Sequence, residues 1–369
     1  MSELKYQQCT RCVMDTSDKE ITFDKNGYCN HCTNFLSVTI NQMYQGASSD
    51  QKLAQIVEKI KEIGKNQKYD CVIGISGGID SCYVAYKAKA LGLKPLAVHL
   101  DNGWNSELAV SNIEKILNKL EIDLYTHVLD WEEFKDLQLS FLKASVPEIE
   151  TPTDIAILTI LHQVAAKHNI KYILSGGNFA TEGILPKSWH YDAKDEKYLK
   201  SIQKQFGSKQ LATFPTFGFL KEMYYKFFKG IKIIYFLNYI PYSKKEAVAL
   251  LEKELNWTYY GGKHYESRYT RFVQSYILPI KFYIDYRKST SSSLICCGEI
   301  TREEALNELK CKSYDVNLVN EDKEYLCKKL GISIPEFDAI MNTPPKTYKD
   351  YPNNKKLLEF LYGVYRKFF

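Results

Sequence analysis

The chain has 369 residues, of which 45% are hydrophobic and 25% are charged, and its formal net charge is +5. This composition is that of a globular protein with room for two or three domains, and it excludes a low-complexity chain. The mild charge suits phosphate-bearing small substrates and does not require nucleic acid. A polar N-terminus without an apolar signal region, together with ten cysteines, predicts a cytoplasmic protein whose thiols serve metal or thiol roles rather than disulfides.

Two C-x-x-C pairs lie near the N-terminus, separated by 16 residues, and consist of Cys9, Cys12, Cys29 and Cys32. Four thiolates at this spacing can wrap one tetrahedral Zn²⁺, and such a closed site predicts a structural rather than a catalytic metal. Residues 21–28 are typical of a strand entering an Asn-Gly turn, so residues 1–40 are expected to form a zinc ribbon. Redox-active or incidental cysteines are the less favoured alternative. His31 could replace one ligand, although the four cysteines are complete without it.

A polar link, residues 41–50, leads to an amphipathic helix that ends near Gly64, and strands and helices then alternate. The alternation predicts an α/β domain at residues 50–185, built on a doubly wound parallel sheet. We expect its strands at residues 70–75, 94–100, 123–128 and 171–174. In such sheets ligands bind beyond the carboxyl ends of the strands, so Ser76, Asp101 and Ser175 should line one crevice.

The first of these strands runs directly into Ser76-Gly77-Gly78-Ile79-Asp80-Ser81, and a helix follows. Glycines allow a turn whose N–H groups point at an anion, and the helix adds its positive N-terminal end. A usual P-loop has a lysine near the place where Asp80 stands. A carboxylate beside phosphates requires a divalent cation between them, most simply Mg²⁺. The loop therefore predicts magnesium-bound pyrophosphate, and hence ATP cleaved between its α and β phosphates, whereas an ordinary Gly-Gly turn is the less favoured alternative.

This strand–loop–helix arrangement resembles the signature of the PP-loop (N-type) ATP pyrophosphatases, which have an adenine nucleotide alpha hydrolase-like fold. That superfamily includes GMP synthetase, asparagine synthetase, NAD synthetase and several tRNA-thiolating enzymes. The resemblance implies that a substrate is adenylated and then attacked by a nitrogen or sulfur nucleophile. It does not identify the substrate.

Two further strand ends carry candidate ligand-binding residues. Asp101, in the segment Asp-Asn-Gly-Trp, is placed for the nucleoside part of ATP, although Trp104 could equally cap the sheet. The segment Ser175-Gly176-Gly177-Asn178 permits close backbone approach to the nucleotide, with a plain turn as the alternative. Glu182 is a candidate second magnesium ligand beside Asp80.

Beyond residue 185 tyrosine and phenylalanine become frequent, and residues 186–369 are expected to form a mainly helical domain for substrate binding and homodimerisation. The apolar stretch at residues 231–240 is too short and too closely flanked by lysines to span a bilayer. Burial or a subunit interface is therefore favoured over contact with a membrane surface.

Basic residues crowd the segment that follows Gly261-Gly262, and Arg287 lies further along. A solvated basic face is the alternative for any one of them. However, cleavage of ATP leaves an anionic pyrophosphate that Lys or Arg must neutralise. We therefore take Lys263, Arg271 and Arg287, together with Asp80, as the catalytic candidates.

The chain shows no glutaminase pattern. Residue 2 is Ser rather than a nucleophilic Cys, and the one His-x-Glu sequence, at residues 264–266, precedes Cys296 and Cys297 instead of following them. Ammonia is therefore expected from a partner protein or from solution.

The combined motifs resemble the N-acetyl sugar amidotransferase family of bacterial surface-polysaccharide biosynthesis over nearly the whole chain. They are the two cysteine pairs, the Ser-Gly-Gly-Ile-Asp-Ser loop, Leu-Asp-Asn-Gly-Trp-Asn, Gly-Gly-Lys-His-Tyr-Glu-Ser and Ser-Leu-Ile-Cys-Cys-Gly-Glu-Ile-Thr-Arg. The resemblance implies a role in lipopolysaccharide, O-antigen or nonulosonic acid biosynthesis, in which ATP activates the acetamide of a sugar and ammonia converts it to an acetamidino group. It also implies a UDP-linked diacetamido-uronic acid or a nonulosonic acid as substrate.

The same resemblance implies a partner, a glutaminase–cyclase pair similar to the two subunits of imidazole glycerol phosphate synthase. The second interpretation is a tRNA-thiolating PP-loop enzyme, in which the cysteine pairs and Cys296-Cys297 would transfer sulfur. The mild charge and the many Tyr and Phe residues favour the sugar enzyme. A scaffold that retains an ATP fold is a third interpretation, against which the intact loop argues.

Overall fold

The computed structural model describes residues 6–262 and 265–368. Its centre is a five-stranded sheet of order β3-β2-β1-β4-β5, in which every neighbouring pair is parallel. The strands are β1 (Cys71–Gly74), β2 (Pro95–Asp101), β3 (Leu124–Val128), β4 (Tyr172–Ser175) and β5 (Lys232–Tyr235). The chain order reverses between β1 and β4, which creates the crevice where ligands of such sheets bind. The predicted doubly wound sheet is thus confirmed.

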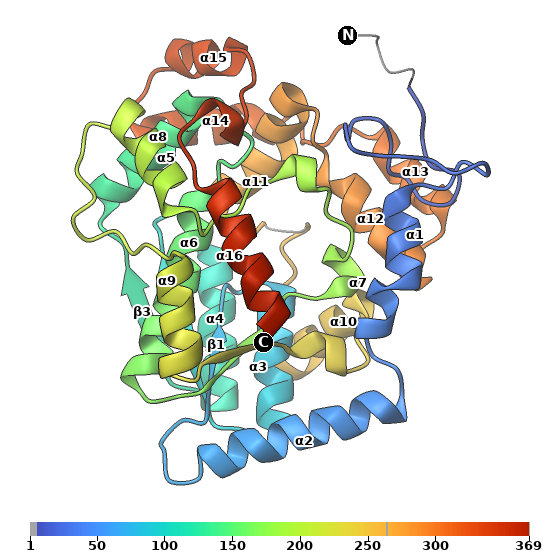
Figure 1. Cartoon of the computed structure of the whole chain (residues 1–369), viewed down its shortest axis with the longest axis vertical. Helices are drawn as coiled ribbons and strands as arrows, with labels where there is room; N and C mark the ends of the chain where they lie inside the picture. The colour runs from blue at the N-terminus through green and yellow to red at the C-terminus, as the bar shows by residue number, and fades with distance from the viewer. Residues whose placement is uncertain (1–5, 263–264, 369) are drawn as a thin grey trace.

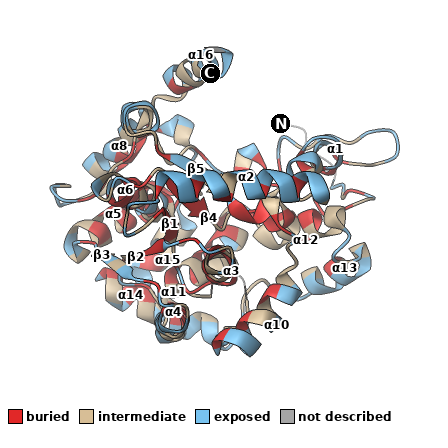
Figure 2. Cartoon of the chain, turned by 90° about the horizontal axis from the view of Figure 1, so that it is seen from below, coloured by how far each residue is buried: buried red, intermediate tan, exposed pale blue. Residues whose placement is uncertain are grey.

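Alternate residues of β1 belong to the two sides of the sheet, as the two-residue period of a strand requires. Cys71 and Ile73 pack on one side with α3 (Ile79–Ala90), α4 (Glu107–Leu120), α10 (Lys244–Leu255) and α2 (Ala47–Ile63). Val72 packs on the other side with α6 (Thr151–Lys167). A parallel sheet covered on both faces needs apolar strands, which is why the middle strands are near-continuous apolar runs. Figure 2 shows the buried strands between these helices, with α2 exposed along its outer side.

The sheet does not end where the predicted boundary at residue 185 lies. β5 pairs with β4 and comes from the region expected to be helical. The apolar stretch that contains it is buried at Ile231, Phe236, Leu237 and Ile240, so burial, the favoured interpretation of this stretch, is confirmed. The two β-branched isoleucines of Lys-Ile-Ile-Tyr suit a strand better than a helix.

Most of the remaining chain after residue 185 is helical, as predicted. It comprises α8 (Glu196–Phe206), α9 (Phe219–Met223), α11 (Arg268–Phe272), α12 (Tyr286–Cys297), α13 (Arg302–Lys310), α14 (Leu318–Leu330), α15 (Ile334–Asn342) and α16 (Lys355–Phe368). Two π-helical segments continue α9 and α11, namely η3 (Tyr224–Phe228) and η5 (Val273–Phe282). Figure 1 shows α16 running across the front of the molecule.

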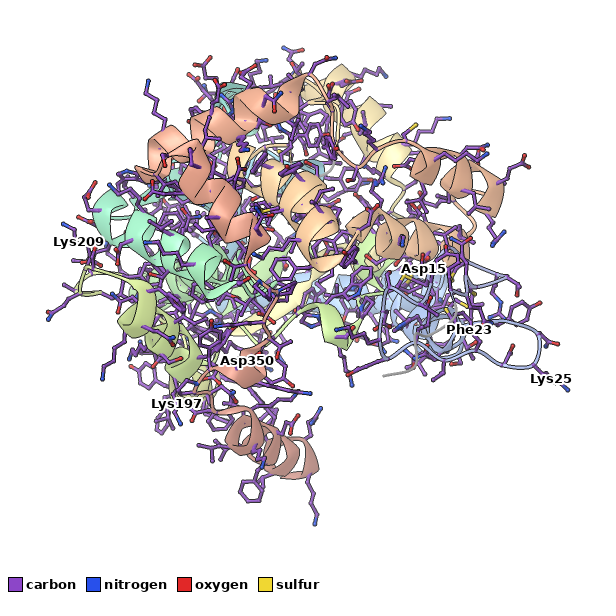
Figure 3. The ribbon with its side chains drawn as sticks, turned by 90° about the horizontal axis from the view of Figure 1, so that it is seen from above. Asp15, Phe23, Lys25, Lys197, Lys209 and Asp350 are labelled. Atoms are coloured by element: carbon purple, nitrogen blue, oxygen red, sulfur yellow. The ribbon has the colours of Figure 1, made fainter. Side chains whose placement is uncertain are left out.

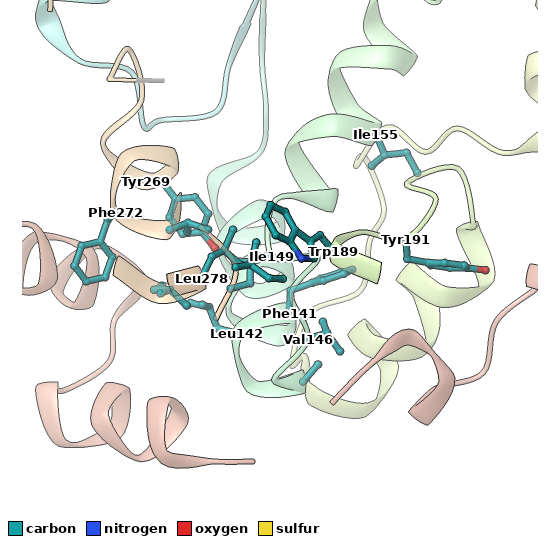
Figure 4. Close-up of a cluster of buried hydrophobic side chains, with 14 of the residues drawn as sticks. Phe141, Leu142, Val146, Ile149, Ile155, Trp189, Tyr191, Tyr269, Phe272 and Leu278 are labelled. Carbon is teal, nitrogen blue, oxygen red and sulfur yellow. The ribbon is translucent and has the colours of Figure 1, made fainter. Parts of the chain in front are cut away.

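A second large core lies outside the sheet and joins the first half of the chain to the last. It brings α5 (Trp131–Ala144) together with the 189–191 segment, α11 and η5, as Figure 4 shows for Phe141, Trp189 and Phe272. The four N-terminal cysteines belong to the same core. No described helix is both long and apolar enough to cross a bilayer.

The N-terminal segment, followed by α1 (Asn30–Ser37), packs against α12 and α13. The backbone N–H of Val13 donates to Ser292 Oγ at 3.2 Å, and Lys288 Nζ lies 2.6 Å from Asp15 Oδ2. Figure 3 shows Lys25 at the outer tip of the loop between the cysteine pairs, on the opposite side of the molecule from Lys209. In place of the strand expected at residues 21–28, the described chain has a single bridge between Phe23 and Cys29, closed by a turn at Gly27.

Candidate active site

The loop after β1 has a backbone that only glycine accommodates at Gly77. Its φ angle is +81°, and a Cβ there would lie 2.5 Å from the Ala109 carbonyl oxygen of α4. The loop is further tied by Ser76 and Ser81, since Ser76 N donates to Ser81 Oγ at 3.2 Å and Gly78 N donates to Ser76 Oγ at 3.2 Å. Because α3 begins directly after Gly78, the turn and the helix N-terminus face the same crevice.

The second glycine pair lies against this loop. A Cβ on Gly176 would lie 3.2 Å from the Asp80 Cβ and 3.2 Å from the Ser81 nitrogen. The strand ends of β1 and β4 therefore meet, as the sequence predicts for Ser76 and Ser175, and the close approach at Gly176 is to the Asp80 segment itself. Gly177 packs instead against the Tyr235 ring.

Three aromatic residues from the second half of the chain hold the loop, and sequence reasoning missed two of them, Tyr242 and Trp257. The Tyr242 hydroxyl donates to Asp80 Oδ1, and Trp257 Nε1 donates to the Gly77 carbonyl at 3.0 Å. Ile79 N donates to the Tyr260 hydroxyl at 3.2 Å. Burial, reinforced by the Asp80 charge, raises the pKa of Tyr242, and burial with the Glu266 charge raises the pKa of Tyr260. Both phenols therefore stay neutral beside the loop.

A cavity of about 1450 Å³ opens from the carboxyl edge of the sheet. A single ligand pocket usually measures roughly 300–1,000 Å³, so this cavity has room for two substrates. Its inner wall includes Ser76, Gly176, Glu182 and Glu266. Its far wall is formed by the inner face of α16, including Tyr362 and Arg366, together with Lys187 and Lys194. Glu182 and Glu266 are the acidic groups of the inner wall, whereas the far end carries both signs of charge, with Lys194 paired to Glu222 and Lys355 near Glu359.

Glu148 and Glu150 line the cavity just before α6. Burial raises the pKa of Glu148 to about 7, and its carboxylate accepts a hydrogen bond from the Tyr198 hydroxyl at 3.0 Å. Gln274 Nε2 donates to Glu150 at 2.8 Å. Glu148 can therefore exchange a proton near neutral pH, a property that no sequence motif signalled.

His99 of β2 also lines the cavity and joins two strand ends. Its Nδ1 lies 2.9 Å from the Ile75 carbonyl and its Nε2 lies 3.1 Å from Asn105 Nδ2. A carbonyl can only accept and an amide nitrogen can only donate, so this arrangement requires the tautomer with its proton on Nδ1. The same strand end is linked to the Glu266 segment by a bridge between Asn105 and Ser267.

Other predicted nucleotide-site residues have local roles in the structure. Asp101 accepts from Gly103 N at 2.9 Å, and its neighbour Asn102 is the residue that lines the cavity. Trp104 is fully buried and donates to Gln138 at 2.7 Å. Asn178 is the N-cap of the short helix α7 (Phe179–Glu182), where its side chain accepts from Thr181 N.

The three basic candidates do not meet at the loop. Lys263 lies outside the described residues. Arg271 pairs with Asp322 through contacts of 2.6–3.0 Å and lines a small second pocket apart from the large cavity. Arg287 pairs with Asp285 at 2.7 Å and donates to the Cys311 carbonyl near the end of α13. The roles of all three in catalysis stay predictions, and in the structure both arginines are already bound to nearby carboxylates.

The four cysteines of the N-terminal pairs come together as predicted. Their sulfur atoms all lie within 4.8 Å of one another, and the Cys9–Cys32 and Cys12–Cys29 sulfurs are 3.7 and 3.6 Å apart. Zn–S bonds of about 2.3 Å in a tetrahedron place sulfurs about 3.8 Å apart, so this cluster fits zinc. Arg302 donates to the carbonyls of Cys9 and Cys12 and holds both in place. His31 bonds to Asp18 at 2.6 Å instead of replacing a ligand.

ATP and Mg²⁺ fit the loop by the chemistry of its donors. Glu182 lines the cavity, Asp80 lies in the loop beside Gly176, and the loop offers backbone N–H groups. Among the described residues only the four cysteines form a preassembled metal cluster, which agrees with Mg²⁺ being held by one or two carboxylates and by substrate phosphates.

Comparison with known proteins identifies one family over the last third of the chain. Residues 266–365 match the family model described as "LPS biosynthesis protein WbpG-like, C-terminal domain". Over 141 residues the chain is 26% identical to the tRNA-specific 2-thiouridylase MnmA 2 of Fusobacterium nucleatum. That alignment covers 35% of this chain and 41% of the relative, so the chain spans less than half of that protein's length.

Two solved structures are similar to this chain at low identity. The first is the NMN synthetase of Francisella tularensis, with 18% identity over 58% of this chain and 94% of that one, and a TM-score of 0.31. The second is the NH3-dependent NAD synthetase of Campylobacter jejuni, with 15% identity over 81% and 98% of the two chains, and a TM-score of 0.31. At such scores the fold assignment rests on the strand order and the loop geometry described above.

Proposed function

Because residues 266–365 belong to the WbpG-like C-terminal domain family of lipopolysaccharide biosynthesis proteins, we propose that this protein is an ATP-dependent, AMP-forming sugar amidotransferase. Its substrate is an N-acetylated sugar, either a UDP-linked diacetamido-uronic acid or a nonulosonic acid. The acetamide oxygen attacks the α-phosphorus of ATP and releases pyrophosphate. Ammonia then adds to the activated carbon, and AMP leaves with the former acetamide oxygen, so that a protonated acetamidino group remains.

One observation carries this proposal: Ser76, the first residue of the glycine loop that also contains Asp80, lines a cavity too large for a single ligand. Adenylation requires two substrates side by side, with the attacking oxygen in line with the α-phosphorus. Glu182 at the inner end suits Mg²⁺ beside ATP phosphates, and Arg366 on α16 suits the acidic group of a sugar.

Asp80 and Glu182 would hold Mg²⁺, and the loop N–H groups would bind the phosphates. Lys263 remains the candidate for neutralising pyrophosphate, since Arg271 and Arg287 already pair with Asp322 and Asp285. We also propose that ammonia comes from a glutaminase–cyclase pair similar to the imidazole glycerol phosphate synthase subunits.

The test is an assay with ATP, Mg²⁺, an ammonium salt and a panel of UDP-linked diacetamido-uronic and nonulosonic acids. We expect AMP and pyrophosphate to appear only with sugar present, together with the mass decrease that accompanies exchange of a sugar oxygen for NH. Release of ADP, or no sugar-dependent turnover across the panel, contradicts the proposal.

The similarity to a tRNA-specific 2-thiouridylase supports a second candidate, sulfur transfer to tRNA. That chemistry needs a reactive cysteine near the loop. Among the described residues no cysteine lines the cavity, and burial raises the pKa of Cys297 to about 11. Retained AMP formation in a Cys296→Ser, Cys297→Ser double variant, without any tRNA, would exclude it.

A further inference from the structure

Two neighbouring segments, α9 with η3 and α16, carry large apolar side chains that are exposed to solvent. Leu220 and Phe228 are 81% and 84% exposed, the two largest values among the big hydrophobic side chains described. On α16, Phe360 and Leu357 are 66% and 53% exposed. We call five side chains the apolar ridge, namely Leu220, Phe228, Leu357, Phe360 and Val364.

The two segments lie side by side, because several of their side chains are in contact. The ring centroids of Phe219 and Tyr362 are 5.1 Å apart, and Lys226 Nζ lies 4.3 Å from the Tyr365 ring centroid. The Tyr362 hydroxyl also donates to Glu222. Figures 2 and 3 show that α16 projects from the rest of the molecule, which leaves its other side open.

The residue spacing of α16 explains why one of its faces is left uncovered. Leu358, Tyr362 and Tyr365 face the cavity. Leu357, Phe360 and Val364 follow at three- and four-residue intervals and so form a second apolar stripe on the exposed side. A helix that is apolar on two sides requires a second apolar environment for the outer one.

The ridge is bordered by cations, which we call the basic rim: Lys226, Lys229, Lys356 and Lys367. None of the four forms an ion pair with a described residue. The acids nearby are already neutralised, since Glu222 pairs with Lys194 at 3.1 Å and Glu196 pairs with Lys221 at 3.3 Å. The surface is thus apolar in the middle and positive at its edge.

We propose that the apolar ridge and its basic rim dock the protein on the surface of an anionic lipid bilayer. Apolar side chains enter the headgroup boundary, and each flanking Lys or Arg near an anionic surface contributes about 1 kcal/mol. A two-fold contact with a second copy is disfavoured, because two basic rims would face each other. Because α16 also walls the cavity, docking holds the cavity mouth next to the lipid surface.

The test is sedimentation of the whole protein with vesicles of phosphatidylcholine, with and without phosphatidylglycerol. We expect binding about tenfold stronger with phosphatidylglycerol, and weaker as salt rises. The double variant Phe228→Ser, Phe360→Ser should lose about tenfold in binding. The matched control Val110→Ser, Leu124→Ser replaces side chains that are also half exposed but lie on α4 and β3, and it should bind as the parent does.

Both variants change exposed side chains, so unaltered circular dichroism and melting temperature would verify that they fold. Equal binding to both vesicle types, or equal loss in the control variant, overturns the proposal. So does a dimer in solution that Phe228→Ser, Phe360→Ser dissociates, because a second copy would then cover the ridge. None of these readouts depends on ATP turnover, so this proposal and the proposed function fail separately.

Discussion

The four N-terminal cysteines and the basic residues between Arg268 and Arg287 are two clusters in the sequence, but only the cysteines meet at a single site. All four sulfurs lie within 4.8 Å of one another, although 16 residues separate the pairs. The basic residues divide between two carboxylates, since Arg268 and Arg271 bind Asp322 whereas Arg287 binds Asp285. A C-x-x-C pair restricts its own backbone, whereas an arginine has a long flexible side chain that reaches any nearby acid. Spacing that restricts the backbone predicts convergence better than charge does.

The largest effect is expected for the cysteines, whose sulfur atoms meet at one site. Replacing Cys9 and Cys12 by Ser should unfold the N-terminal segment and the core around it, because structural zinc contributes on the order of 10 kcal/mol to folding. Metal analysis and thermal melting would measure this. As a control, Cys311→Ser changes an exposed cysteine and should retain zinc and melting temperature. A stable, zinc-free double variant would show that the cysteines converge without a metal.

A substitution of Asp80 tests whether the loop, like the cysteine cluster, is a functional site that the local sequence determines. Asp80→Asn should lower turnover by about 10³-fold, equivalent to about 4 kcal/mol, because magnesium and phosphates lose their carboxylate. The matched control is Asp101→Asn, since Asp101 is a carboxylate at the end of the neighbouring strand β2 that, among the described residues, accepts a hydrogen bond only from the backbone of its own turn. Similar losses in the two variants would refute a specific role for Asp80.

For the basic cluster, the test residue is Arg271, which shares the buried Asp322 carboxylate with Arg268. Arg271→Gln should reduce the free energy of unfolding by about 3 kcal/mol, because the buried Asp322 loses its charge-assisted hydrogen bonds to Arg271 and keeps only Arg268 as a cationic partner. Turnover of the folded fraction should change little. Denaturant unfolding and steady-state kinetics separate the two effects, and a variant of unchanged stability but lost turnover would restore Arg271 as a catalytic residue.

The last prediction concerns Glu148, a residue that neither cluster contains. Its pKa is raised from an ordinary 4.5 to about 7, so the folded protein binds a proton more tightly than the unfolded chain does. Stability should therefore fall by about 3 kcal/mol as pH rises from 4.5 to 7. The Glu148→Gln variant should lack this part of the pH dependence in denaturant titrations. Equal slopes for parent and variant would contradict the assignment.

The parts of the fold that sequence predicted are those in which a local pattern dictates structure. β1, its loop and α3 appear where an apolar run, two glycines and a helix start indicate them, and α10 spans the expected residues. The helix α12 was missed because its buried face is made of serines rather than apolar residues. Ser292 and Ser293 are fully buried and accept from Val13 N and Ile184 N, so their partners lie far along the chain.

The residues of the candidate site also fall into two groups, those that a local sequence pattern predicted and those that only the folded chain brings to the loop. Ser76, Asp101 and Ser175 were predicted to line one crevice. Ser76 and Ser175 do line one cavity, because strand ends of a parallel sheet meet at one edge, whereas Asn102 lines it in place of Asp101. Tyr242 and Trp257 reach the loop from 162 and 180 residues away. Nothing in their own neighbourhood signals that contact, which arises only when α10 packs against α3.

The contacts between the first residues of the chain and α12–α13 also dictate the order in which the molecule is completed. Val13 and Ser292 are 279 residues apart, and Arg302 reaches back 290 residues to Cys12. At roughly 5–20 residues per second, a ribosome needs on the order of tens of seconds to supply those partners. The cysteine segment, even with zinc bound, thus waits with an uncovered apolar side until synthesis is nearly finished, and chaperone protection is needed most during that interval.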